Sequence, residues 1–406
     1  MRYYDYLIVG GGIIGLTIAR ELKRRYPERT IAILEKEEDV AKHSSGRNSG
    51  VLHAGFYYSA DSLKARFTKE GNQAMTRYCE DNGLKINKCG KIVVATNEEE
   101  LQGLYELKKR ADRNGVELHW ITESELRRID SNVRTFKRAL YSPTTSTVDP
   151  VEVCAKLKEE ITSSGVEIFF NCPYRRQKDN LVYAGNEVFE CGYFINAAGL
   201  YADKIAHEAG FGQAYTIIPF KGIYLKYAKN KTDLQTNVYP VPNLKNPFLG
   251  VHFTKTVDGS IKIGPTAIPA FWRENYKGLS RFKLGEFVSI LRFEWKLFVS
   301  NAFHFRTLAF EEMKKYMKRH FIGLSLKMVK KIDSKGFGDF MKPGIRAQLL
   351  NKETLELLQD FVIEGDHRSM HVLNAVSPAF TCSMPFAKYV VDAISEKQGG
   401  HKVEAG

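Results

Sequence analysis

The spacing of apolar and polar residues along this chain predicts nine strands and six helices. Short apolar runs bounded by turn residues indicate strands. These runs cover residues 6–9, 30–34, 91–96, 167–171, 193–196, 222–226, 248–254, 261–265 and 370–372. Apolar residues at helical spacing indicate helices. They cover residues 14–25, 62–82, 98–114, 150–164, 202–209 and 386–396. Because strands and helices alternate and no internal repeat occurs, we expect an α/β fold.

The N-terminal segment DYLIVGGGIIGLTIAREL joins an apolar strand to an amphipathic helix through a glycine-rich turn. Gly10, Gly12 and Gly15 have the spacing G-x-G-x-x-G. The first glycine permits a tight turn, the second lets backbone approach a pyrophosphate, and the third lets the helix pack on the strand. Phosphates then meet the free N–H groups at the start of the helix, where Ile13 and Ile14 lie. We therefore expect a dinucleotide-binding unit.

An acidic residue follows the next predicted strand. Glu35 lies 20 residues after Gly15, the offset at which a carboxylate accepts hydrogen bonds from ribose hydroxyls. Its neighbour Lys36 joins the predicted cofactor site. The alternative is a tight strand–helix turn that binds nothing, but strand, helix, second strand and acid together favour a dinucleotide. The glycines alone do not distinguish NAD from FAD.

Two later segments combine small residues in a way that suits close packing on a cofactor. The first, SSGRNSGVLHAGFYY, spans residues 44–58, and the second, NAAGLYAD, follows the strand predicted at 193–196. The small residues expected at the cofactor are Ser44, Ser45, Gly46, Asn48, Ser49, Gly50, Ala198 and Gly199. The rings that end the first segment, His53, Tyr57 and Tyr58, are expected to reach the substrate.

The motifs GGGIIG, SGRNSGVLHAGFYY, NAAGLYAD, GIRAQ and NAVSPA together resemble the D-amino-acid oxidase superfamily of FAD enzymes, and within it the L-2-hydroxyglutarate oxidase/dehydrogenase family. The resemblance runs over nearly the whole chain. It implies a Rossmann-type FAD-binding domain of the glutathione-reductase kind plus a mixed-sheet substrate domain. The FAD-binding domain is expected over 1–85, 145–215 and 345–406, and the substrate domain over 86–144 and 216–344.

The resemblance implies oxidation of L-2-hydroxyglutarate to 2-oxoglutarate, with hydride transfer from C2 to flavin N5 and electrons passed on to oxygen or a membrane quinone. The hydroxyl proton needs a base within hydrogen-bond reach. His53 and His252 are the candidates, because imidazole titrates near neutral pH. His53 is preferred because it follows the flavin-side loop directly. His252 lies on an apolar strand, where a histidine is also often a hydrogen-bonded core residue.

A dicarboxylate substrate requires cationic partners. Arg346 in KPGIRAQ matches the position where the superfamily commonly holds a carboxylate-binding arginine, and a guanidinium can bind a carboxylate through two hydrogen bonds. Gln348 is expected to add a hydrogen bond. Lys221 and Arg47 are the candidates for the distal carboxylate. The alternative for Arg346 is a surface ion pair.

The segment NAVSPAFTCSMPFAKYVV precedes and opens the last predicted helix. Asn374, Ser377 and Pro378 lie ahead of it. A helix N-terminus directed at the flavin would stabilise the negative charge that arrives with the hydride. The two prolines of the segment, Pro378 and Pro385, suit a first turn or a kink. The alternative is a capped C-terminal helix without a cofactor role.

Charge changes this picture in one segment. The chain has 406 residues and a formal net charge of +13. Residues 281–335 carry 13 Lys and Arg against five Asp and Glu, interleaved with apolar residues as in LRFEWKLFVSNAFHF. Such a segment is either a helical subdomain with a solvated basic face or a surface that contacts anionic lipid. Nucleic acid is not an expected partner.

The remaining composition narrows compartment and class. The six cysteines form no C-x-x-C pair and have no metal-like spacing, so we expect neither a disulfide scaffold nor a bound metal. No leader-like segment and no run of about 18 apolar residues occur. We expect a cytoplasmic protein, with the basic segment offering contact with the inner face of the membrane. Two other functions stay open: an FAD enzyme acting on an amino acid or glycerol 3-phosphate, and a non-catalytic flavin-bound interaction protein.

Overall fold

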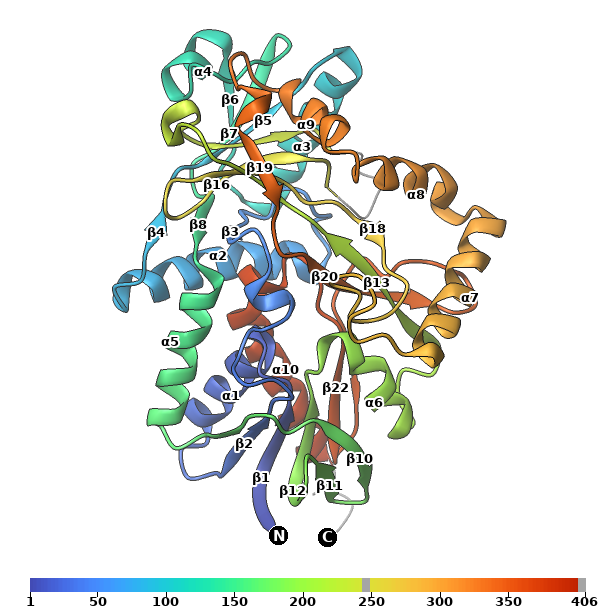
Figure 1. The fold of residues 1–406 in the computed structure, drawn as a ribbon. Coiled ribbons are helices and arrows are strands. Elements are labelled where there is room, and N and C mark those ends of the chain that lie inside the picture. Colours follow the sequence, from blue (N-terminus) through green and yellow to red (C-terminus); the bar gives the residue numbers. More distant parts are fainter. Residues whose placement is uncertain (243–248, 401–406) are drawn as a thin grey trace. The chain divides into compact units, whose positions relative to one another are not determined.

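The computed structural model describes residues 1–242 and 249–400. The chain forms two compact units, each built from separate stretches of sequence (Figure 1). Unit 1 takes Met1–Arg47, Pro150–Pro219 and the chain from Arg346 on, and unit 2 takes Asn48–Asp149 and Phe220–Ile345. Both units combine sheets with helices, so the predicted α/β class is confirmed.

Unit 1 is organised by a mostly parallel sheet. Its strand order is β10-β11-β12-β1-β2-β9, with β22 joined to β12 and β21 to β22. Strands β9, β2, β1, β12 and β22 pair in parallel, whereas β10, β11 and β21 add antiparallel edges. The bounds are β1 Arg2–Val9, β2 Ile31–Leu34, β9 Glu167–Phe169, β10 Tyr174–Lys178, β11 Leu181–Ala184, β12 Glu187–Asn196, β21 Val362–Gly365 and β22 Ser369–Asn374. Leu7, Ile33 and Phe194 have no exposed surface, as expected for strands buried on both faces.

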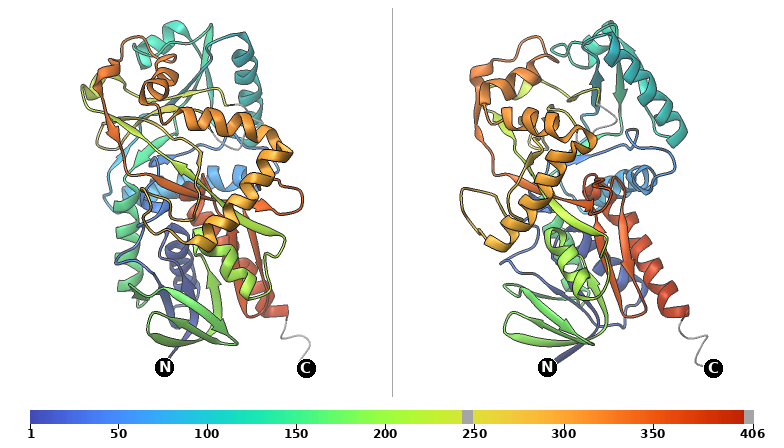
Figure 2. Two further views of the ribbon diagram at one scale, coloured as in Figure 1. Left: turned by 45° about the vertical axis from the view of Figure 1, so that its right-hand side comes forward. Right: turned by 90° about the vertical axis from the view of Figure 1, so that its right-hand side faces the viewer.

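The helices of unit 1 pack on this sheet and on one another. They are α1 Ile13–Arg25, α5 Pro150–Ser163, α6 Ala202–Glu208 and α10 Ala379–Gly400. Helix α1 packs against both α5 and α10 (Figures 1 and 2). Arg25 joins α1 to α10, because its guanidinium pairs with Glu21 at 2.6 Å and with Asp392 at 2.5 Å. The contacts of α1 fix the direction in which its N-terminus points.

Unit 2 contains an eight-stranded mixed sheet in the order β19-β14-β17-β16-β15-β5-β7-β6. Its β15–β5 pair is parallel, and the other pairs are antiparallel. The bounds are β5 Lys91–Val94, β6 His119–Thr122, β7 Arg138–Ser142, β14 Leu225–Tyr227, β15 Asn237–Pro240, β16 His252–Lys255, β17 Ile261–Gly264 and β19 Phe337–Phe340. The mixed sheet predicted beside the Rossmann-type part of the fold is therefore confirmed.

Smaller elements complete unit 2. A three-stranded sheet joins β3 Val51–Leu52, β8 Ser146–Val148 and β4 Ile86–Asn87. Strand β18 Ile268–Pro269 pairs with β13 Tyr215–Gly222. The chain passes between the units in β13 and in β20 Gly344–Asn351. The helices are α2 Leu63–Asp81, α3 Glu98–Asn114, α4 Glu123–Ile129, α7 Leu284–Ser300, α8 Phe305–Lys314 and α9 Lys318–Leu326.

The two faces of the eight-stranded sheet bury different clusters. Ile92, Val94 and Phe253 belong to one apolar cluster. Val93 and Tyr239 belong to another, which includes the loop after β3 and the buried side of α3. Because successive side chains of a strand point to opposite faces, Lys91 shares the face of Val93. This second face carries the histidines that the sequence singled out.

Most predicted elements are confirmed, with differences at three places. The strand predicted at 222–226 is divided between two strands: β13 ends at Gly222 and β14 begins at Leu225, because the N–H of Ile223 donates to Thr266 Oγ1 instead of to a neighbouring strand. Strand β16 begins at His252, later than the predicted 248–254, and Phe248 lies outside the described residues. Helix α10 begins seven residues before the predicted 386, so Pro385 lies inside it.

The two units also differ from the expected domain division over residues 48–85, which were placed with the FAD-binding part. These residues group with unit 2. The reason is local, because β3 pairs with β8 and α2 packs against β3 and β4.

In the described part of the chain, no helix is both long enough and apolar enough to span a membrane.

Candidate active site

The glycine-rich turn of unit 1 depends on the absence of side chains. Gly10 has φ +113°, and a Cβ added there would lie 2.4 Å from the carbonyl oxygen of Ala197. A Cβ on Gly15 would lie 2.0 Å from the carbonyl oxygen of Gly10. Both clashes involve backbone, which cannot move away as a flexible side chain can. The structure also brings two sequence motifs together here, since the N–H of Ala197 donates to Val9 at 2.9 Å.

The start of α1 has the properties of an anion-binding helix terminus. Its N-cap, Gly12, makes no side-chain capping bond, and the first turn contains no acidic residue. The N–H of Ile13 donates to Ser45 Oγ at 2.9 Å. Ile14 follows in the same turn. Free N–H groups and the positive end of the helix dipole favour negative charge at this position.

The short helix η1, Ser44–Gly46, places Ser45 at that terminus. A Cβ on Gly46 would lie 2.2 Å from the carbonyl oxygen of Ala41, so close backbone approach explains this glycine. Gly199, at the end of the second small-residue segment, has φ +55° and open space around it. Its neighbour Ala198 lies beside Gly10, with 3.3 Å between the Ala198 Cα and a Cβ built on Gly10. The expected small residues of unit 1 therefore gather around the glycine turn.

Glu35 is buried directly behind the turn. Its Oε2 accepts the N–H of Gly11 at 2.7 Å, and its Oε1 accepts the N–H of Glu37 at 2.9 Å. Burial raises the pKa of this carboxyl, against the opposing effect of the two backbone N–H groups. A carboxylate has about four acceptor positions, so it can still accept ribose hydroxyls. The ammonium of Lys36 lies 5.0 Å from the ring centre of Tyr201.

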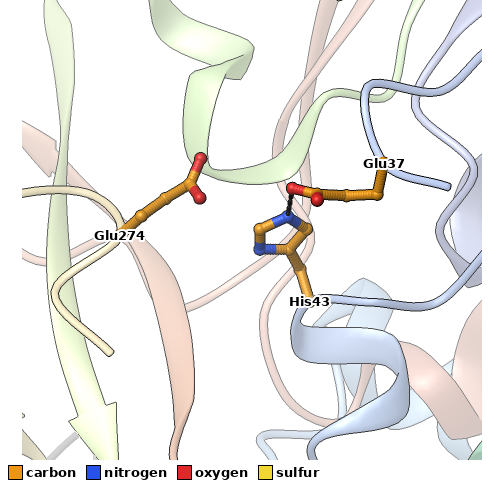
Figure 3. A group of neighbouring side chains, drawn as sticks. All are labelled: Glu37, His43 and Glu274. Atoms are coloured by element: carbon orange, nitrogen blue, oxygen red, sulfur yellow. Dashed lines mark hydrogen bonds and ion pairs between the residues drawn. The ribbon is translucent and has the colours of Figure 1, made fainter. Parts of the chain in front are cut away.

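A second polar pair lies close to Glu35 and was not predicted from the sequence. Figure 3 shows His43 Nε2 hydrogen-bonded to Glu37 Oε1, at 2.8 Å. The pair joins the two ends of the loop between β2 and η1, because Glu37 follows β2 and His43 precedes Ser44. Glu274, also drawn there, belongs to unit 2, where it pairs with Arg281.

These observations fit an adenine dinucleotide. The turn has no room for side chains, the helix terminus lacks a charged cap, and a buried carboxylate lies 20 residues beyond the third glycine. Each feature corresponds to one part of such a ligand: pyrophosphate at the turn and helix, ribose at the carboxylate.

The predicted residues near the C-terminus have more structural roles than expected. Asn374 Nδ2 donates to the carbonyls of Leu358 at 3.0 Å and Asp360 at 2.6 Å, while its buried Oδ1 has no hydrogen-bond partner among the described residues. Ser377 and Pro378 precede α10, and the Pro378 carbonyl accepts the N–H of Cys382 at 3.1 Å. This bond joins Pro378 to the first turn of α10, which begins at Ala379 rather than near 386.

The two candidates on β20 have different surroundings. Arg346 is partly buried. The Gln348 side chain is buried, and its Nε2 donates to the carbonyls of Leu358 at 2.7 Å and Leu349 at 3.4 Å. Since the amide hydrogens of Gln348 are directed at backbone, it braces β20 against the loop before β21. A substrate contact of this side chain is not supported. Arg47 is the last residue of unit 1, and its N–H donates to Ser44.

In unit 2 the loop that carries His53, Tyr57 and Tyr58 is held by side chains from two helices. Asn72 of α2 donates from Nδ2 to the carbonyls of Leu52 at 3.1 Å and His53 at 3.2 Å. Asn114 of α3 does the same for Gly55 and Tyr58, and Arg110 of α3 donates to Tyr57 at 2.9 Å. Satisfied backbone carbonyls in a buried loop restrict its motion. Sequence reasoning missed these braces.

The start of that segment forms a tight turn. Asn48 Oδ1 accepts the N–H of Gly50 at 2.8 Å, and Ser49 Oγ accepts the N–H of Val51 at 3.3 Å. The carbonyl of Asn48 accepts a long hydrogen bond from Lys262, at 3.4 Å. Asn48, Ser49 and Gly50 belong to unit 2, whereas Ser44–Gly46 belong to unit 1.

His252 is buried on β16 and stacked on Tyr239 of β15. The ring centres are 3.7 Å apart and the ring planes differ by 15°. Its Nδ1 lies 2.9 Å from the carbonyl oxygen of Gly250. A carbonyl only accepts, so Nδ1 carries a hydrogen.

His53 is 7% exposed and is kept neutral by its surroundings. Burial is the main cause that lowers its pKa well below the ordinary value, and the charges of Lys91 and His252 lower it further. A neutral imidazole is the form that accepts a proton. Lys91 was not predicted, although a lysine that opens the apolar strand KIVV is a readable signal.

Lys221 is buried in unit 2. Its ammonium donates to Asn275 Oδ1 at 3.3 Å, and burial lowers its pKa. In this hydrogen bond the ammonium group of Lys221 meets a neutral amide rather than a carboxylate. A cation of this kind can bind an incoming carboxylate.

Comparison with known proteins covers both units. A family model described as FAD dependent oxidoreductase matches residues 5–393. The chain is 35% identical to the mitochondrial L-2-hydroxyglutarate dehydrogenase of Nematostella vectensis, over 98% of this chain and 91% of that protein. It is 34% identical to L-2-hydroxyglutarate dehydrogenase of Escherichia coli K12, over 96% and 93%. The human mitochondrial enzyme of that name is 33% identical, over 97% and 89%.

Solved structures show the same fold. The FAD-bound L-α-glycerophosphate oxidase of Mycoplasma pneumoniae matches with TM-score 0.74 and 22% identity, covering 97% of this chain and 95% of that one. Glycine oxidase of Geobacillus kaustophilus matches with TM-score 0.70 and 19% identity, over 98% and 96%. The fold of this chain is therefore shared with these two oxidases.

Proposed function

Because this chain belongs to the FAD-dependent oxidoreductase family, and within it to the L-2-hydroxyglutarate dehydrogenases, we propose that it oxidises L-2-hydroxyglutarate to 2-oxoglutarate with FAD as its cofactor. The observation that carries the proposal is the full-length similarity to enzymes of that name. The neutral, buried imidazole of His53 supports it, because the reaction requires a proton acceptor.

FAD, when bound, supplies the two-electron acceptor for the hydride that leaves C2 of the substrate. The residues proposed to hold it are those around the glycine turn and α1: Gly10, Gly12, Ile13, Ile14, Gly15, Glu35, Lys36, Ser44, Ser45, Gly46, Ala198 and Gly199. From the other predicted segments, Asn48, Ser49, Gly50, Asn374, Ser377 and Pro378 are proposed to line it.

The substrate's own bonds set the tasks of the protein. As the C2–H bond breaks, the C2 hydroxyl loses its proton and becomes the carbonyl of 2-oxoglutarate. His53 accepts that proton, with His252 as the second candidate. Arg346 binds the C1 carboxylate through its guanidinium, and Lys221 binds the distal carboxylate. Tyr57 and Tyr58 border the substrate.

Anaerobic mixing tests the reaction directly. Purified holoenzyme is mixed with L- or D-2-hydroxyglutarate while the flavin absorbance near 450 nm is followed. The L enantiomer is expected to bleach the flavin and to yield 2-oxoglutarate. Oxygen or a soluble quinone is then added to identify the second acceptor. Bleaching by an amino acid with ammonia release, or by glycerol 3-phosphate, would replace the substrate assignment. No bleaching by any of them, with salt-sensitive RNA binding, would favour a non-catalytic role.

Replacing Arg346 by Ala is expected to raise KM for L-2-hydroxyglutarate by about 10- to 100-fold, with a smaller change in kcat, because a two-bond carboxylate contact is lost. Steady-state kinetics measure both constants. Arg175→Ala is the matched control, since this arginine of unit 1 is exposed on β10. An Arg346→Ala variant with the KM of the control would remove Arg346 from the substrate site.

A surface of unit 2 supports contact with a membrane. Five apolar residues of α7 recur every three or four positions and are exposed, with Trp295 at 65%. These residues are Leu284, Val288, Leu291, Trp295 and Val299. The opposite side of the helix is buried through Ile290 and Leu297. Phe310 and Met313 of α8 and Met317, just before α9, are exposed apolar residues as well.

Basic residues accompany this apolar stripe. Exposed Arg292, Lys296, Lys314 and Arg319 lie on the same three helices. A purely solvated basic face would not need an apolar stripe, whereas a helix that lies on a lipid surface combines both. Since anionic lipids give the cytoplasmic leaflet a negative surface potential, the proposed contact is with the inner face of the membrane, which would bring the protein to a membrane quinone as electron acceptor.

Trp295→Ser is expected to weaken binding to vesicles of phosphatidylglycerol and phosphatidylcholine by about tenfold, since an exposed tryptophan loses its apolar contact. Vesicle co-sedimentation measures this binding. Val151→Ser is the control, because Val151 is 53% exposed on α5 of unit 1, away from the stripe in sequence and unit. No binding to anionic vesicles, or equal weakening in both variants, would reject this surface.

A further inference from the structure

Lys91 is a fully buried lysine at the centre of the unit 2 sheet. It opens β5, where it pairs with Asn237 of β15 and Ser142 of β7. Its side chain has no exposed surface. Strand alternation directs it to the sheet face that also carries Tyr239 and the loop with His53.

Three aromatic rings surround the ammonium group. Lys91 Nζ lies 4.9 Å from the ring centre of Phe56, 4.8 Å from that of Tyr57 and 4.6 Å from that of Tyr239. Among the described residues, Nζ has no hydrogen-bond partner. Each ring presents the negative face of its π system, which attracts a cation. The rings therefore replace hydrogen-bonding partners as the main local support for the charge.

Packing alone does not account for a lysine here. A buried charge without a partner costs several kcal/mol, and a methionine of similar length would fill the same space without that cost. Burial lowers the pKa of Lys91 to about 7. The group is consequently poised between charged and neutral forms at neutral pH.

The charge of Lys91 acts on the proposed base. It lowers the pKa of His53, after burial and ahead of His252 of β16. Tyr57 and Tyr239 are neutral here because burial raises the pKa of each well above its ordinary value. Two other cations carried by neighbouring elements are directed at other rings. Lys64 of α2 lies 5.9 Å from the ring of Tyr58, and Lys262 of β17 lies 4.9 Å from that of Tyr224.

We propose that Lys91 is a positioning residue for the oxidation: its ammonium group, caged by Phe56 and Tyr57 of the His53 loop and by Tyr239, places a positive charge beside the group that accepts the substrate's proton. This inference rests on the base role proposed for His53. The effect grows where it is needed, because the fraction of charged Lys91 increases as the pH falls below about 7 and opposes the protonation of His53.

The test compares the holoenzyme with its Lys91→Met variant. NMR of ¹³C-labelled histidine follows the titration of His53, whose signal is assigned by its loss in His53→Gln. We expect the titration midpoint of His53 to move to higher pH in Lys91→Met. The rate of flavin reduction at pH 6 relative to pH 8 is expected to fall by at most about fourfold, because burial still keeps the pKa of His53 below 6.5 and at least about a quarter of the imidazole then stays neutral at pH 6.

Two further variants keep the outcome clear. Lys255→Met is the matched control, because Lys255 is also a buried lysine of this sheet but donates to the carbonyls of Lys231 and Leu234. It is expected to leave the His53 midpoint unchanged. Lys91→Gln supplies a second neutral side chain should Lys91→Met fail to fold, although removal of a buried charge is expected to raise the unfolding temperature.

The possible failures are distinguishable. An unchanged His53 midpoint in both Lys91 variants would overturn the inference, whatever happens to turnover. A midpoint that moves while flavin reduction keeps its pH profile would support the effect of Lys91 on His53 and reject His53 as the base. Equal midpoint shifts in the Lys91 and Lys255 variants would assign the effect to general loss of buried charge and overturn the specific role.

Discussion

His53→Ala is expected to keep the yellow flavin and to lower the rate of flavin reduction by L-2-hydroxyglutarate by at least about 10²-fold. The variant loses the proton acceptor, and general base catalysis contributes about 10²–10⁴-fold. Cofactor retention is expected because the residues proposed for FAD around the glycine turn belong to unit 1, whereas His53 belongs to unit 2. Stopped-flow absorbance measures the reduction rate, and the absorbance ratio of flavin to protein measures cofactor content.

Variants of two other histidines are compared with His53→Ala. His119→Ala is the control, since His119 is exposed on β6 and pairs with Glu117 at 2.7 Å. His252→Ala is expected to lose the stack on Tyr239 and to cost less than His53→Ala. A His53→Ala enzyme that reduces its flavin at the normal rate would exclude His53 as the base. A larger loss in His252→Ala would transfer the role to His252.

The buried state of His53 also predicts a dependence of stability on pH. Its pKa in the folded protein is lowered below the ordinary value of 6.5. Between these two pKa values the unfolded chain binds a proton that the folded chain does not, so the free energy of unfolding falls as the pH drops below about 6.5. His53→Ala removes this contribution, and denaturant unfolding at pH 7 and pH 5 is expected to show a smaller difference in the variant.

The local half of the site was predictable because its chemistry depends on spacing along the chain. Gly10, Gly12 and Gly15 fall within one strand–turn–helix unit, and Glu35 follows on the next strand. Short-range pattern was enough to predict that unit. The sequence also indicated both residues that meet at this turn: Gly10 and Ala197 directly follow predicted strands, and in the structure these strands pair in parallel.

The other half depends on pairing between distant strands. Lys91 and Tyr239 meet because β5 and β15 pair in parallel across 146 positions of sequence. No local period announces that partnership, although the lysine in KIVV marks an exception worth explaining. The side chains Asn72 and Asn114, which brace the loop, were also missed. In the sequence, an amide on a helix that becomes buried cannot be told from any other polar residue.

Polar residues beside a motif are a second case that the sequence leaves undecided. Gln348 lies two positions after Arg346, and the sequence cannot show whether its amide meets ligand or backbone. In the structure its donors meet Leu349 and Leu358. The apolar stripe of α7 is the opposite case: the sequence indicated the basic segment, but only the structure shows which apolar residues of the helix are exposed and which are buried.

Gly15→Ala is expected to yield protein that folds poorly and contains little FAD, with cofactor content reduced by at least about tenfold. A Cβ at this position would lie 2.0 Å from the carbonyl oxygen of Gly10, so α1 must move away from β1 or the turn must change its path. Either change separates the free N–H groups of the helix from the turn that is proposed to hold the pyrophosphate.

Gly285→Ala separates this steric effect from the general cost of an added methyl group. Gly285 lies in α7, and a Cβ there meets nothing within 4 Å, so this change is expected to stabilise the protein by about 0.5–1 kcal/mol, because alanine favours the helix. Thermal unfolding and the flavin-to-protein absorbance ratio are measured for both variants. Full FAD content in Gly15→Ala would mean that the dinucleotide does not depend on the close approach of α1 to the glycine turn, and the cofactor site would have to be sought elsewhere in unit 1.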